Sequence, residues 1–373
     1  MAGANIAGVL PADARIAIVF GTRPEVVKLA DLARRLGPAA VLVHTGQHWD
    51  DAMSGVFLRD LGVGRPHHDL EIGGLTRGEQ VGEATAALSR LLGTLRPAAV
   101  VVQGDTNSVL AGALAANAVE VPIVHLEAGL RSFDRRMPEE HNRVVVDHLA
   151  DLCLAPTEVN AANLRDEGIP EDRIAVTGNT VVEAVQRLLP SADERAALRA
   201  AYGLDAGGFV LATIHRPENT DGEALAAVLT ALKAIPAPVV LPLHPRTASR
   251  VAAAGLTPLL ERLRVVEPLP YVPFLGLLAE CGVAVSDSGG VQEEVSVLGR
   301  PVVVVRRSTE RPEVMGTWAQ LVEPGPAVTE AVADLWKDLP ALHERLAAIP
   351  SPYGDGTASA RAERAMEKLL IGP

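Results

Sequence analysis

The chain has 373 residues, too many for one ordinary hydrophobic core, so its length predicts two domains. Its net charge of −12 argues against a general nucleic-acid binder and against a partner of anionic membranes, and no apolar run approaches membrane-spanning length. The two cysteines, Cys153 and Cys281, each lie at a predicted strand and are too few for a disulfide framework. Residues 1–14 lack the basic segment and apolar core of a signal peptide, so we expect a cytoplasmic protein with reduced, buried thiols.

The first half of the chain alternates apolar, β-rich runs with helical patterns. Strands are predicted at residues 15–20, 40–44, 98–103, 123–126, 152–155 and 174–176. A helix is predicted to end near residue 36, a second to cover 79–95, and a long loop to cover 62–78. This alternation is typical of a parallel sheet.

The pattern restarts after a helix predicted at 181–189 and a polar stretch at 191–206. Strands are predicted at 209–213, 239–243, 264–266, 283–286 and 301–305, and helices at 291–298 and 358–370. We therefore predict an α/β protein with two Rossmann-like domains. The first comprises residues 1–180, with the C-terminal helix 358–373 packing back on it, and the second comprises residues 181–357.

One stretch joins a strand to a helix through a small polar turn: Ser286-Asp287-Ser288-Gly289-Gly290-Val291-Gln292-Glu293-Glu294. Glycines let the backbone approach a ligand closely, and the N–H groups at the start of a helix attract anions. The two glutamates can stabilise the helix dipole and nothing more, or one of them can bind the hydroxyls of a ribose. From this stretch alone, both interpretations stay open.

Ionisable and polar residues follow the strands of both halves. The first half offers Arg23, His44, Gln47, Asp105 and Glu127, and the second offers residues 215–219, His244 and residues 288–294. Ligands of open parallel sheets bind beyond the carboxyl ends of the strands, so we expect two facing domains with a ligand in a central cleft. Any one of these residues alone is explained by an ordinary structural role, such as a helix cap for Asp105.

Several site classes are excluded by missing motifs. The sequence has no P-loop, no Gly-x-Gly-x-x-Gly fingerprint, no Gly-x-Ser-x-Gly elbow, no His-Glu-x-x-His, no zinc-spaced cysteine pair and no Asp-x-Asp. Metal-independent chemistry on a phosphorylated ligand is the prediction.

An ordered set of motifs resembles the non-hydrolysing UDP-N-acetylglucosamine 2-epimerase family over residues 15–365. The motifs are Gly21-Thr22-Arg23-Pro24-Glu25 with Lys28, Gln103-Gly104-Asp105-Thr106, His125-Leu126-Glu127-Ala128-Gly129-Leu130-Arg131, Pro138-Glu139-Glu140-His141-Asn142-Arg143, Thr177-Gly178-Asn179-Thr180, His215-Arg216-Pro217-Glu218-Asn219, residues 286–294 and Thr309-Glu310-Arg311-Pro312-Glu313. The resemblance implies a GT-B-type fold, a homodimer, a role in cell-surface polysaccharide biosynthesis, and reversible interconversion of UDP-GlcNAc and UDP-ManNAc without a cofactor. The expected route is anti elimination of UDP to a 2-acetamidoglucal and re-addition.

The resemblance also implies roles for individual residues. Its catalytic candidates are Asp105, Glu127, Glu139, His215, Arg143 and Lys28. Its candidates for binding UDP are Arg23, His244, Arg216, Ser288, Gly289, Gly290 and Glu294, and no metal ligands are expected. Arg143 is four residues after Glu139, which predicts that the two share a helix face and that Arg143 orients Glu139 or balances its charge. Which carboxylate is the acid and which the base stays open.

Three rival functions remain: a hydrolysing epimerase that releases UDP and ManNAc, a GT-B glycosyltransferase, and a non-catalytic nucleotide-sugar sensor. The segment after Gln47-His48, which reads Trp49-Asp50-Asp51, departs from the pattern of relatives that carry a second, regulatory UDP-GlcNAc pocket. Asp50 adds a negative charge there, and residues 73–74 are glycines where a basic side chain is expected, although Arg77 could replace it. These departures predict loss of that regulation, or a different nucleotide sugar.

Overall fold

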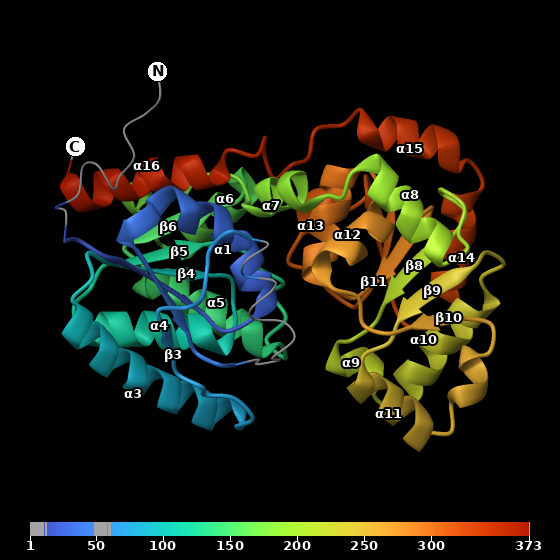
Figure 1. Cartoon of the computed structure of the whole chain (residues 1–373), viewed down its shortest axis with the longest axis horizontal. Helices are drawn as coiled ribbons and strands as arrows, with labels where there is room; N and C mark the ends of the chain where they lie inside the picture. Colours follow the sequence, from blue (N-terminus) through green and yellow to red (C-terminus); the bar gives the residue numbers. More distant parts are fainter. Residues whose placement is uncertain (1–10, 12, 48–57, 59–60, 373) are drawn as a thin grey trace. The chain divides into compact units, whose positions relative to one another are not determined.

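A computed structural model describes residues 11, 13–47, 58 and 61–372, with the side chain of Arg246 left out. The chain divides into two compact units, one of residues Met1–Ala184 with Tyr353–Pro373 and the other of residues Val185–Pro352. Each unit is built around its own parallel sheet (Figure 1).

The first unit contains a seven-stranded parallel sheet in the order β3-β2-β1-β4-β5-β6-β7. Its strands are β1 Ile16–Phe20, β2 Ala40–His44, β3 His68–Asp69, β4 Ala99–Gln103, β5 Ile123–Leu126, β6 Leu152–Ala155 and β7 Ile174–Val176. The central strand β1 reads Ile-Ala-Ile-Val-Phe and is buried along its whole length. A strand with apolar residues on both faces needs cover on both faces, which explains why it forms the middle of a layered α/β unit.

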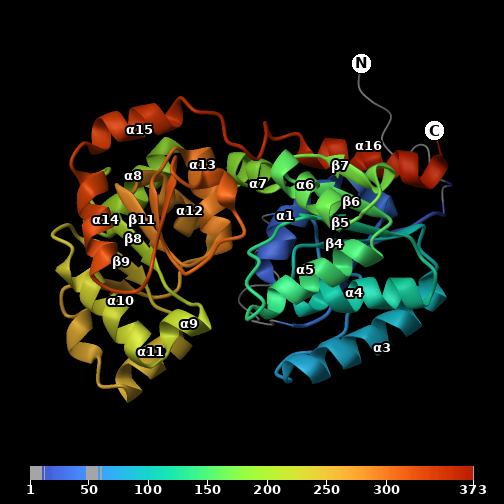
Figure 2. The ribbon, with the colours of Figure 1, turned by 180° about the vertical axis from the view of Figure 1, so that it is seen from behind.

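Helices cover both faces of this sheet. They are α1 Arg23–Leu36, α3 Arg77–Leu95, α4 Asn107–Ala118, α5 Pro138–Leu149, α6 Glu158–Asp166 and α16 Ala358–Ile371, and the division between the two units falls within α7 Val181–Leu188. Helices α3, α4 and α5 pack side by side, whereas α16 packs on α1 and β6 (Figure 2). The C-terminal helix is held by a salt bridge of 2.7 Å between Arg35 and Glu363 and by hydrogen bonds from Ser359 to Glu183.

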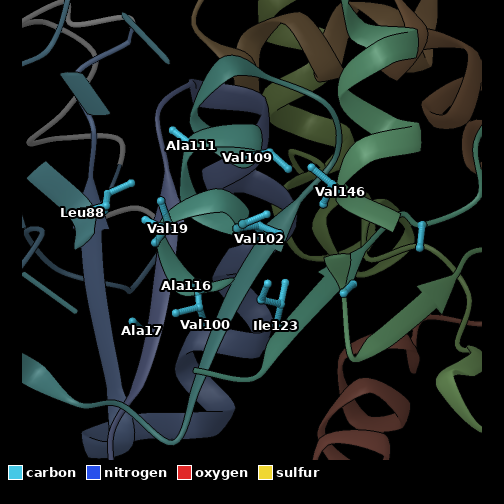
Figure 3. Packing of buried hydrophobic residues seen from close by; sticks show 14 of the residues in the cluster. Ala17, Val19, Leu88, Val100, Val102, Val109, Ala111, Ala116, Ile123 and Val146 are labelled. Atoms are coloured by element: carbon cyan, nitrogen blue, oxygen red, sulfur yellow. The ribbon is translucent and has the colours of Figure 1, made fainter. Parts of the chain in front are cut away.

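The core of the first unit is made of small and branched side chains. Val19, Val100 and Val102 of the sheet pack with Leu88 of α3 and Val146 of α5, and all five are completely buried (Figure 3). This core presses α3–α5 onto the sheet and thereby positions the helix starts at its carboxyl edge.

The second unit contains a six-stranded parallel sheet in the order β10-β9-β8-β11-β12-β13. Its strands are β8 Val210–Thr213, β9 Val239–Pro242, β10 Arg264–Val266, β11 Val283–Ser286, β12 Val302–Val305 and β13 Ala319–Val322. Its helices are α8 Ala192–Ala201, α9 Pro217–Thr220, α10 Gly222–Ala234, α11 Pro245–Ala253, α12 Tyr271–Glu280, α13 Gly289–Leu298, α14 Pro326–Trp336 and α15 Leu339–Ala347.

The two sheets share the same reversal of strand order. In the first unit the order changes direction between β1 and β4, and in the second between β8 and β11. Loops leave such a point in opposite directions and open a crevice at the carboxyl ends of the strands, where ligands of this class of sheet bind. The candidate residues around Arg23 and Asp105, and around His215 and Ser288, follow these four strands.

The predicted α/β class with two parallel sheets is confirmed, and the expected strands lie within one or two residues of the observed ones. The strands β3, inside the predicted loop 62–78, and β13 were not predicted, and neither was α8, inside the polar stretch 191–206. A two-residue strand has no readable period, and α8 has no buried residue to give it an apolar stripe. Among the described residues, no helix combines the length and apolar character needed to cross a membrane.

Candidate active site

Glu127 follows β5 directly and sits in a cage of hydrogen-bond donors. Its Oε1 accepts from Lys28 Nζ and from Asn179 Nδ2, the latter at 2.6 Å, and its Oε2 accepts from Gln103 Nε2. The backbone of Glu127 has a φ of +63°, which costs a residue with a side chain about 1–3 kcal/mol. Both oxygens of this buried carboxylate are therefore in use, and the local strain is held by three segments of the first unit.

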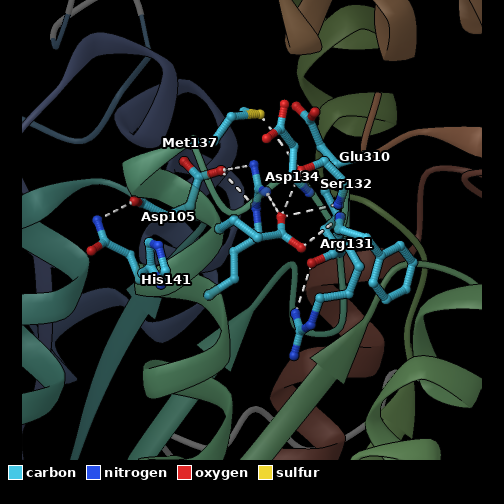
Figure 4. A network of polar contacts seen from close by, with 12 residues as sticks. Asp105, Arg131, Ser132, Asp134, Met137, His141 and Glu310 are labelled. Atoms are coloured by element: carbon cyan, nitrogen blue, oxygen red, sulfur yellow. Dashed lines mark hydrogen bonds and ion pairs between the residues drawn. The ribbon is translucent and has the colours of Figure 1, made fainter. Parts of the chain in front are cut away.

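Asp105 follows β4 and is bound by Arg143 of α5. Its Oδ2 accepts from Arg143 Nε at 3.0 Å and from Nη2 at 2.5 Å, while its other oxygen accepts no hydrogen bond from the described residues. Arg143 is buried, and its Nη1 also donates to Glu140 Oε2 at 2.5 Å. Glu140 in turn accepts from the backbone N–H groups of Ser132 and Phe133, so Asp105 and Ser132 belong to one polar network (Figure 4).

Glu139 differs from these two carboxylates. It lies in the first turn of α5, is half-buried, and makes no hydrogen bond or ion pair with any part of the chain that the structure describes. The predicted pairing of Glu139 with Arg143 is wrong, because Arg143 pairs with Glu140 and Asp105 instead. The guanidinium of Arg143 is buried, and a buried charge must be paired with an opposite charge. Asp105 and Glu140 provide that charge, and the more accessible Glu139 does not.

Glu25 ties the loops after β1 and β4 together. Its carboxylate accepts from the backbone N–H of Gly21 at 3.1 Å and from Thr106 Oγ1 at 3.1 Å. Burial raises the pKa of Glu25 to about 7, although hydrogen bonds from Thr22, Gly21 and Thr106 oppose that shift. Glu25 thus titrates near neutral pH, although the motif that contains it assigned it no role.

The remaining strand ends of the first unit are packed tightly. A Cβ on Gly21 would come within 1.8 Å of Ser108 Oγ, so the turn after β1 requires glycine. Ser108 donates from its N–H and its hydroxyl to Gln47 Oε1, at 3.0 and 2.8 Å. His44 pairs with Asp69 at 3.2 Å. Arg23 is the first residue of α1 and is half-buried.

In the second unit, the buried carboxylate of Asp287 organises the turn after β8. It accepts from the backbone N–H groups of His215 at 3.0 Å and Arg216 at 2.9 Å, and from Asn219 Nδ2 at 3.1 Å. It also pairs with His215 Nδ1 at 2.9 Å. Burial would raise the pKa of Asp287, but His215, Arg216 and Asn219 outweigh that effect and hold it below its usual value.

This pairing directs the imidazole of His215. Because Nδ1 faces an ionised carboxylate, it carries a proton, and the ring turns Nε2 away from Asp287. The side chain of His215 is 56% exposed, so Nε2 is available to a ligand. Asp287 is part of the quoted motif, but no role was assigned to it from the sequence. Its position between two serines at the end of a strand was the signal that could have indicated a functional role.

The start of α13 is suited to a phosphate group. Ser288 is the N-cap residue but its side chain caps no backbone N–H, and the helix begins with Gly289 and Gly290. A Cβ on Gly289 would lie 2.8 Å from Arg311 Nη1, whereas a Cβ on Gly290 would make only ordinary contacts, at 3.9 Å from Ser288 Oγ and 4.0 Å from Glu294 Oε1. Arg216 Nε donates to the carbonyl oxygen of Asp287 at 2.9 Å, which places a guanidinium beside this helix start.

The structure separates the two glutamates of α13. Glu293 is completely buried and forms an ion pair of 2.7 Å with Arg311, which also pairs with Glu310. Glu294 accepts a hydrogen bond of 2.9 Å from Tyr271 Oη. Glu293 is therefore part of the buried support of α13, which leaves Glu294 as the candidate for the ribose. His244 is exposed in the loop after β9.

The predicted loss of a regulatory pocket depends on residues that the structure describes only in part. Trp49, Asp50 and Asp51 lie outside the described residues. Arg77 is the candidate to replace the basic side chain missing at residues 73–74. It donates to Asn142 Oδ1 at 2.8 Å and to the carbonyl oxygen of Pro138 at 3.3 Å. The prediction about regulation stays untested. In the described ranges no three His, Cys, Asp or Glu side chains gather as metal ligands.

Comparison with known proteins gives a family for this geometry. The UDP-N-acetylglucosamine 2-epimerase family matches residues 31–367. The UDP-N-acetylglucosamine 2-epimerase of Methanocaldococcus jannaschii is 36% identical over 364 residues, covering 94% of this chain and 98% of that protein. The UDP-2,3-diacetamido-2,3-dideoxy-D-glucuronate 2-epimerase of Pseudomonas aeruginosa is also 36% identical, over 95% of this chain and all of that protein.

A solved structure agrees in fold. The crystal structure of UDP-GlcNAc 2-epimerase from Neisseria meningitidis bound to UDP-GlcNAc has a TM-score of 0.86, with 32% identity over 96% of this chain and 100% of that chain. The two Rossmann-like units thus form a GT-B-type fold. By sequence and by fold, the chain belongs to the UDP-N-acetylglucosamine 2-epimerase family of isomerases.

Proposed function

We propose that the protein is a non-hydrolysing UDP-GlcNAc 2-epimerase that interconverts UDP-GlcNAc and UDP-ManNAc without a cofactor. The observation that carries this proposal is the unequal state of three carboxylates in the first unit. Glu127 has both oxygens hydrogen-bonded, whereas Asp105 keeps one oxygen, and Glu139 both, without a hydrogen bond to the described residues. An epimerase needs two groups that exchange a proton with one carbon from opposite faces, and a transferase needs only one base.

The second unit binds the UDP moiety. The N–H groups of Gly289 and Gly290 and the guanidinium of Arg216 hold the diphosphate, and Glu294 accepts hydrogen bonds from the ribose hydroxyls. His244 completes the set of the second unit, and Arg23 of the first unit is the remaining UDP-binding candidate carried by the motifs. His215 Nε2 stabilises the departing diphosphate oxygen, because Asp287 fixes the tautomer and orientation of the ring.

The first unit moves the proton. One of Asp105 and Glu139 removes the C2 proton, the C1–O bond breaks with its electron pair going to the diphosphate oxygen of UDP, and a C1–C2 double bond forms. The other carboxylic acid then returns a proton to the opposite face of C2 while the same diphosphate oxygen re-forms the bond to C1. Atoms and charge balance without an oxidant or reductant.

Glu127 and Arg143 support this step. Glu127 accepts from three donors and holds the ammonium group of Lys28, whose positive charge offsets the negative charge of UDP. Arg143 binds one oxygen of Asp105 and directs the other outward.

We further propose that the enzyme is a cytoplasmic homodimer in the synthesis of cell-surface polysaccharide. Both cysteines are buried and form no disulfide, which suits a reducing compartment. Light scattering after size exclusion, at concentrations from 1 to 100 times the assay level, tests the dimer.

The decisive experiment incubates the protein with UDP-GlcNAc in D₂O and follows the products by NMR. Formation of UDP-ManNAc with deuterium at C2 is expected, at a constant total of UDP-sugar. A parallel sample with UDP-2,3-diacetamido-2,3-dideoxyglucuronate tests the other substrate represented among the relatives. The Asp105→Asn variant serves as the inactive control.

The rival functions give different products. Stoichiometric free UDP and ManNAc would show a hydrolysing epimerase. No change in UDP-GlcNAc without an added acceptor would favour a glycosyltransferase or a sensor. Turnover of the diacetamido substrate alone would retain the epimerase mechanism and replace the sugar.

A further inference from the structure

A buried charged cluster lies beneath the three carboxylates and has no role in the chemistry proposed above. It consists of His125 of β5, Asp147 of α5 and Arg131 of the loop after β5, all of them buried. His125 Nδ1 lies 2.6 Å from Asp147 Oδ1, and Arg131 Nη2 lies 2.7 Å from Asp147 Oδ2. Arg131 also forms a two-pronged contact of 2.6 and 2.7 Å with Glu167.

Both ring nitrogens of His125 have an oxygen within hydrogen-bond distance. Its Nε2 lies 2.8 Å from the carbonyl oxygen of Gly104, which can only accept. Burial would raise the pKa of Asp147, but His125 and Arg131 outweigh that effect and keep it low, so the carboxylate also only accepts. Each ring nitrogen of His125 therefore faces an oxygen that only accepts, so the imidazole links the Gly104 carbonyl to Asp147.

The cluster reaches each of the three segments that carry the carboxylates. The Gly104 carbonyl that His125 holds belongs to the residue before Asp105. Asp147 Oδ2 accepts from the N–H of Gly129, at 3.1 Å, two residues after Glu127. Asp147 itself lies on α5, the helix that presents Glu139.

The two glycines show how little freedom these segments have. Gly104 has a φ of +82°, and its N–H donates to the carbonyl oxygen of Leu126 at 3.0 Å. Gly129 has a φ of +81°, and a Cβ there would lie 2.2 Å from the carbonyl oxygen of Asn160. The cluster thus holds the backbone at two turns whose positive φ favours glycine.

We propose that His125, with Asp147, is a positioning residue that sets the places of Asp105, Glu127 and Glu139 relative to one another. The inference rests on the proposed function, because it concerns the two-faced proton transfer at C2. His125 touches no substrate; it acts through the Gly104 carbonyl and through Asp147.

Two conservative substitutions separate the two contacts of the imidazole ring. The amide N–H of His125→Gln can reach the Gly104 carbonyl but leaves Oδ1 of Asp147 without its partner, and His125→Asn does the reverse. The matched control is His343→Gln in the second unit, since His343 Nε2 also lies 2.8 Å from a glycine carbonyl, that of Gly282. UDP affinity and circular dichroism establish that each variant is folded.

The informative readout is a ratio within one reaction. In D₂O, the carboxylate that removed the proton exchanges it for deuterium; if the second carboxylate is displaced from the opposite face, the first returns deuterium to the face from which the proton left, so recovered UDP-GlcNAc gains C2 deuterium without epimerising. The ratio of this exchange to UDP-ManNAc formation is independent of how much enzyme is folded. A merely structural role for His125 would leave that ratio unchanged.

Both His125 variants are expected to lower kcat about 100-fold per UDP-binding site, as a displacement of about 1 Å does. They are also expected to raise the ratio of exchange to epimerisation several-fold. UDP affinity should stay within about twofold of the wild-type value, because the groups proposed to hold the diphosphate lie in the second unit. If neither variant folds, Glu167→Gln decides, because Glu167 lies at the accessible end of the cluster; a change of about threefold in the same direction is expected. Unchanged kcat and exchange ratio in folded variants overturn the inference alone. A wild-type chain that makes no UDP-ManNAc overturns the proposed function and the inference together.

Discussion

Replacing Asp287 by asparagine tests the claim that one buried charge organises the second unit's site. The substitution preserves the size of the side chain and removes its charge. Asp287 is completely buried and accepts from His215, Arg216 and Asn219, with the imidazole of His215 as a further partner. In the variant, one carboxylate oxygen becomes an NH₂ group that cannot accept any of these bonds.

The geometry gives a magnitude for the loss. Oδ2 takes the bonds from Arg216 and Asn219, so an amide in that position leaves two buried donors unpaired. Each unsatisfied donor costs about 1–3 kcal/mol, and we expect a loss of about 4 kcal/mol in the free energy of unfolding of the second unit. With a urea dependence of about 2 kcal/mol per molar, the unfolding midpoint falls by about 2 M.

The assay is urea unfolding followed by tryptophan fluorescence, because Trp318 and Trp336 both belong to the second unit. The lowered pKa of Asp287 fixes the sign of the pH dependence. Its stabilisation is complete above the unfolded value of about 3.8 and is lost as the pH falls through the lower folded value. The gap between wild type and variant is therefore full at pH 7 and narrows below about pH 3.8.

The exposed Asp205→Asn serves as the control and should change stability by less than about 0.5 kcal/mol. UDP affinity is expected to fall together with stability in the Asp287 variant. A midpoint within about 0.3 M of wild type at pH 7, with UDP affinity retained, would refute the reasoning.

Four further predictions test the first unit and the overall mechanism. Glu139→Gln should lower kcat about 100- to 10,000-fold with UDP affinity retained, while the exposed Glu158→Gln stays active; a smaller loss than tenfold would remove Glu139 from proton transfer. Since Glu25 has a folded pKa of about 7 against an ordinary 4.5, the native state keeps a proton that the unfolded chain loses between these values. Stability should thus fall by up to about 3 kcal/mol as pH rises through that window, and Glu25→Gln should abolish this fall; parallel pH profiles of wild type and variant in urea titrations would contradict it. Activity should survive exhaustive EDTA treatment, and a loss restored by Mg²⁺ or Mn²⁺ would overturn the cofactor-free mechanism. Pure UDP-ManNAc should be converted hyperbolically without added UDP-GlcNAc, and a lag that a trace of UDP-GlcNAc abolishes would show that the Asp50 argument is wrong.

The sequence by itself determined the fold class, because strands buried on both faces read as unbroken apolar runs such as residues 16–20 and 302–305. It also determined which residues follow the strands, since a strand end is a local property of the pattern. The expected family followed from the order of motifs and is confirmed. Segments without a period, such as His68–Asp69 and Ala192–Ala201, could not be read in this way.

Only the tertiary structure decided the partners of the charged side chains. Sequence spacing suggested that Arg143 pairs with Glu139, whereas burial turned it toward Asp105, 38 positions away. The same applies to Glu127, whose donors Lys28 and Asn179 come from distant segments, and to Asp287, whose role depends on the turn after another strand. The physical reason is that a buried charge is satisfied by whatever donors the fold brings within about 3 Å, and that set depends on how strands and helices pack rather than on any local pattern.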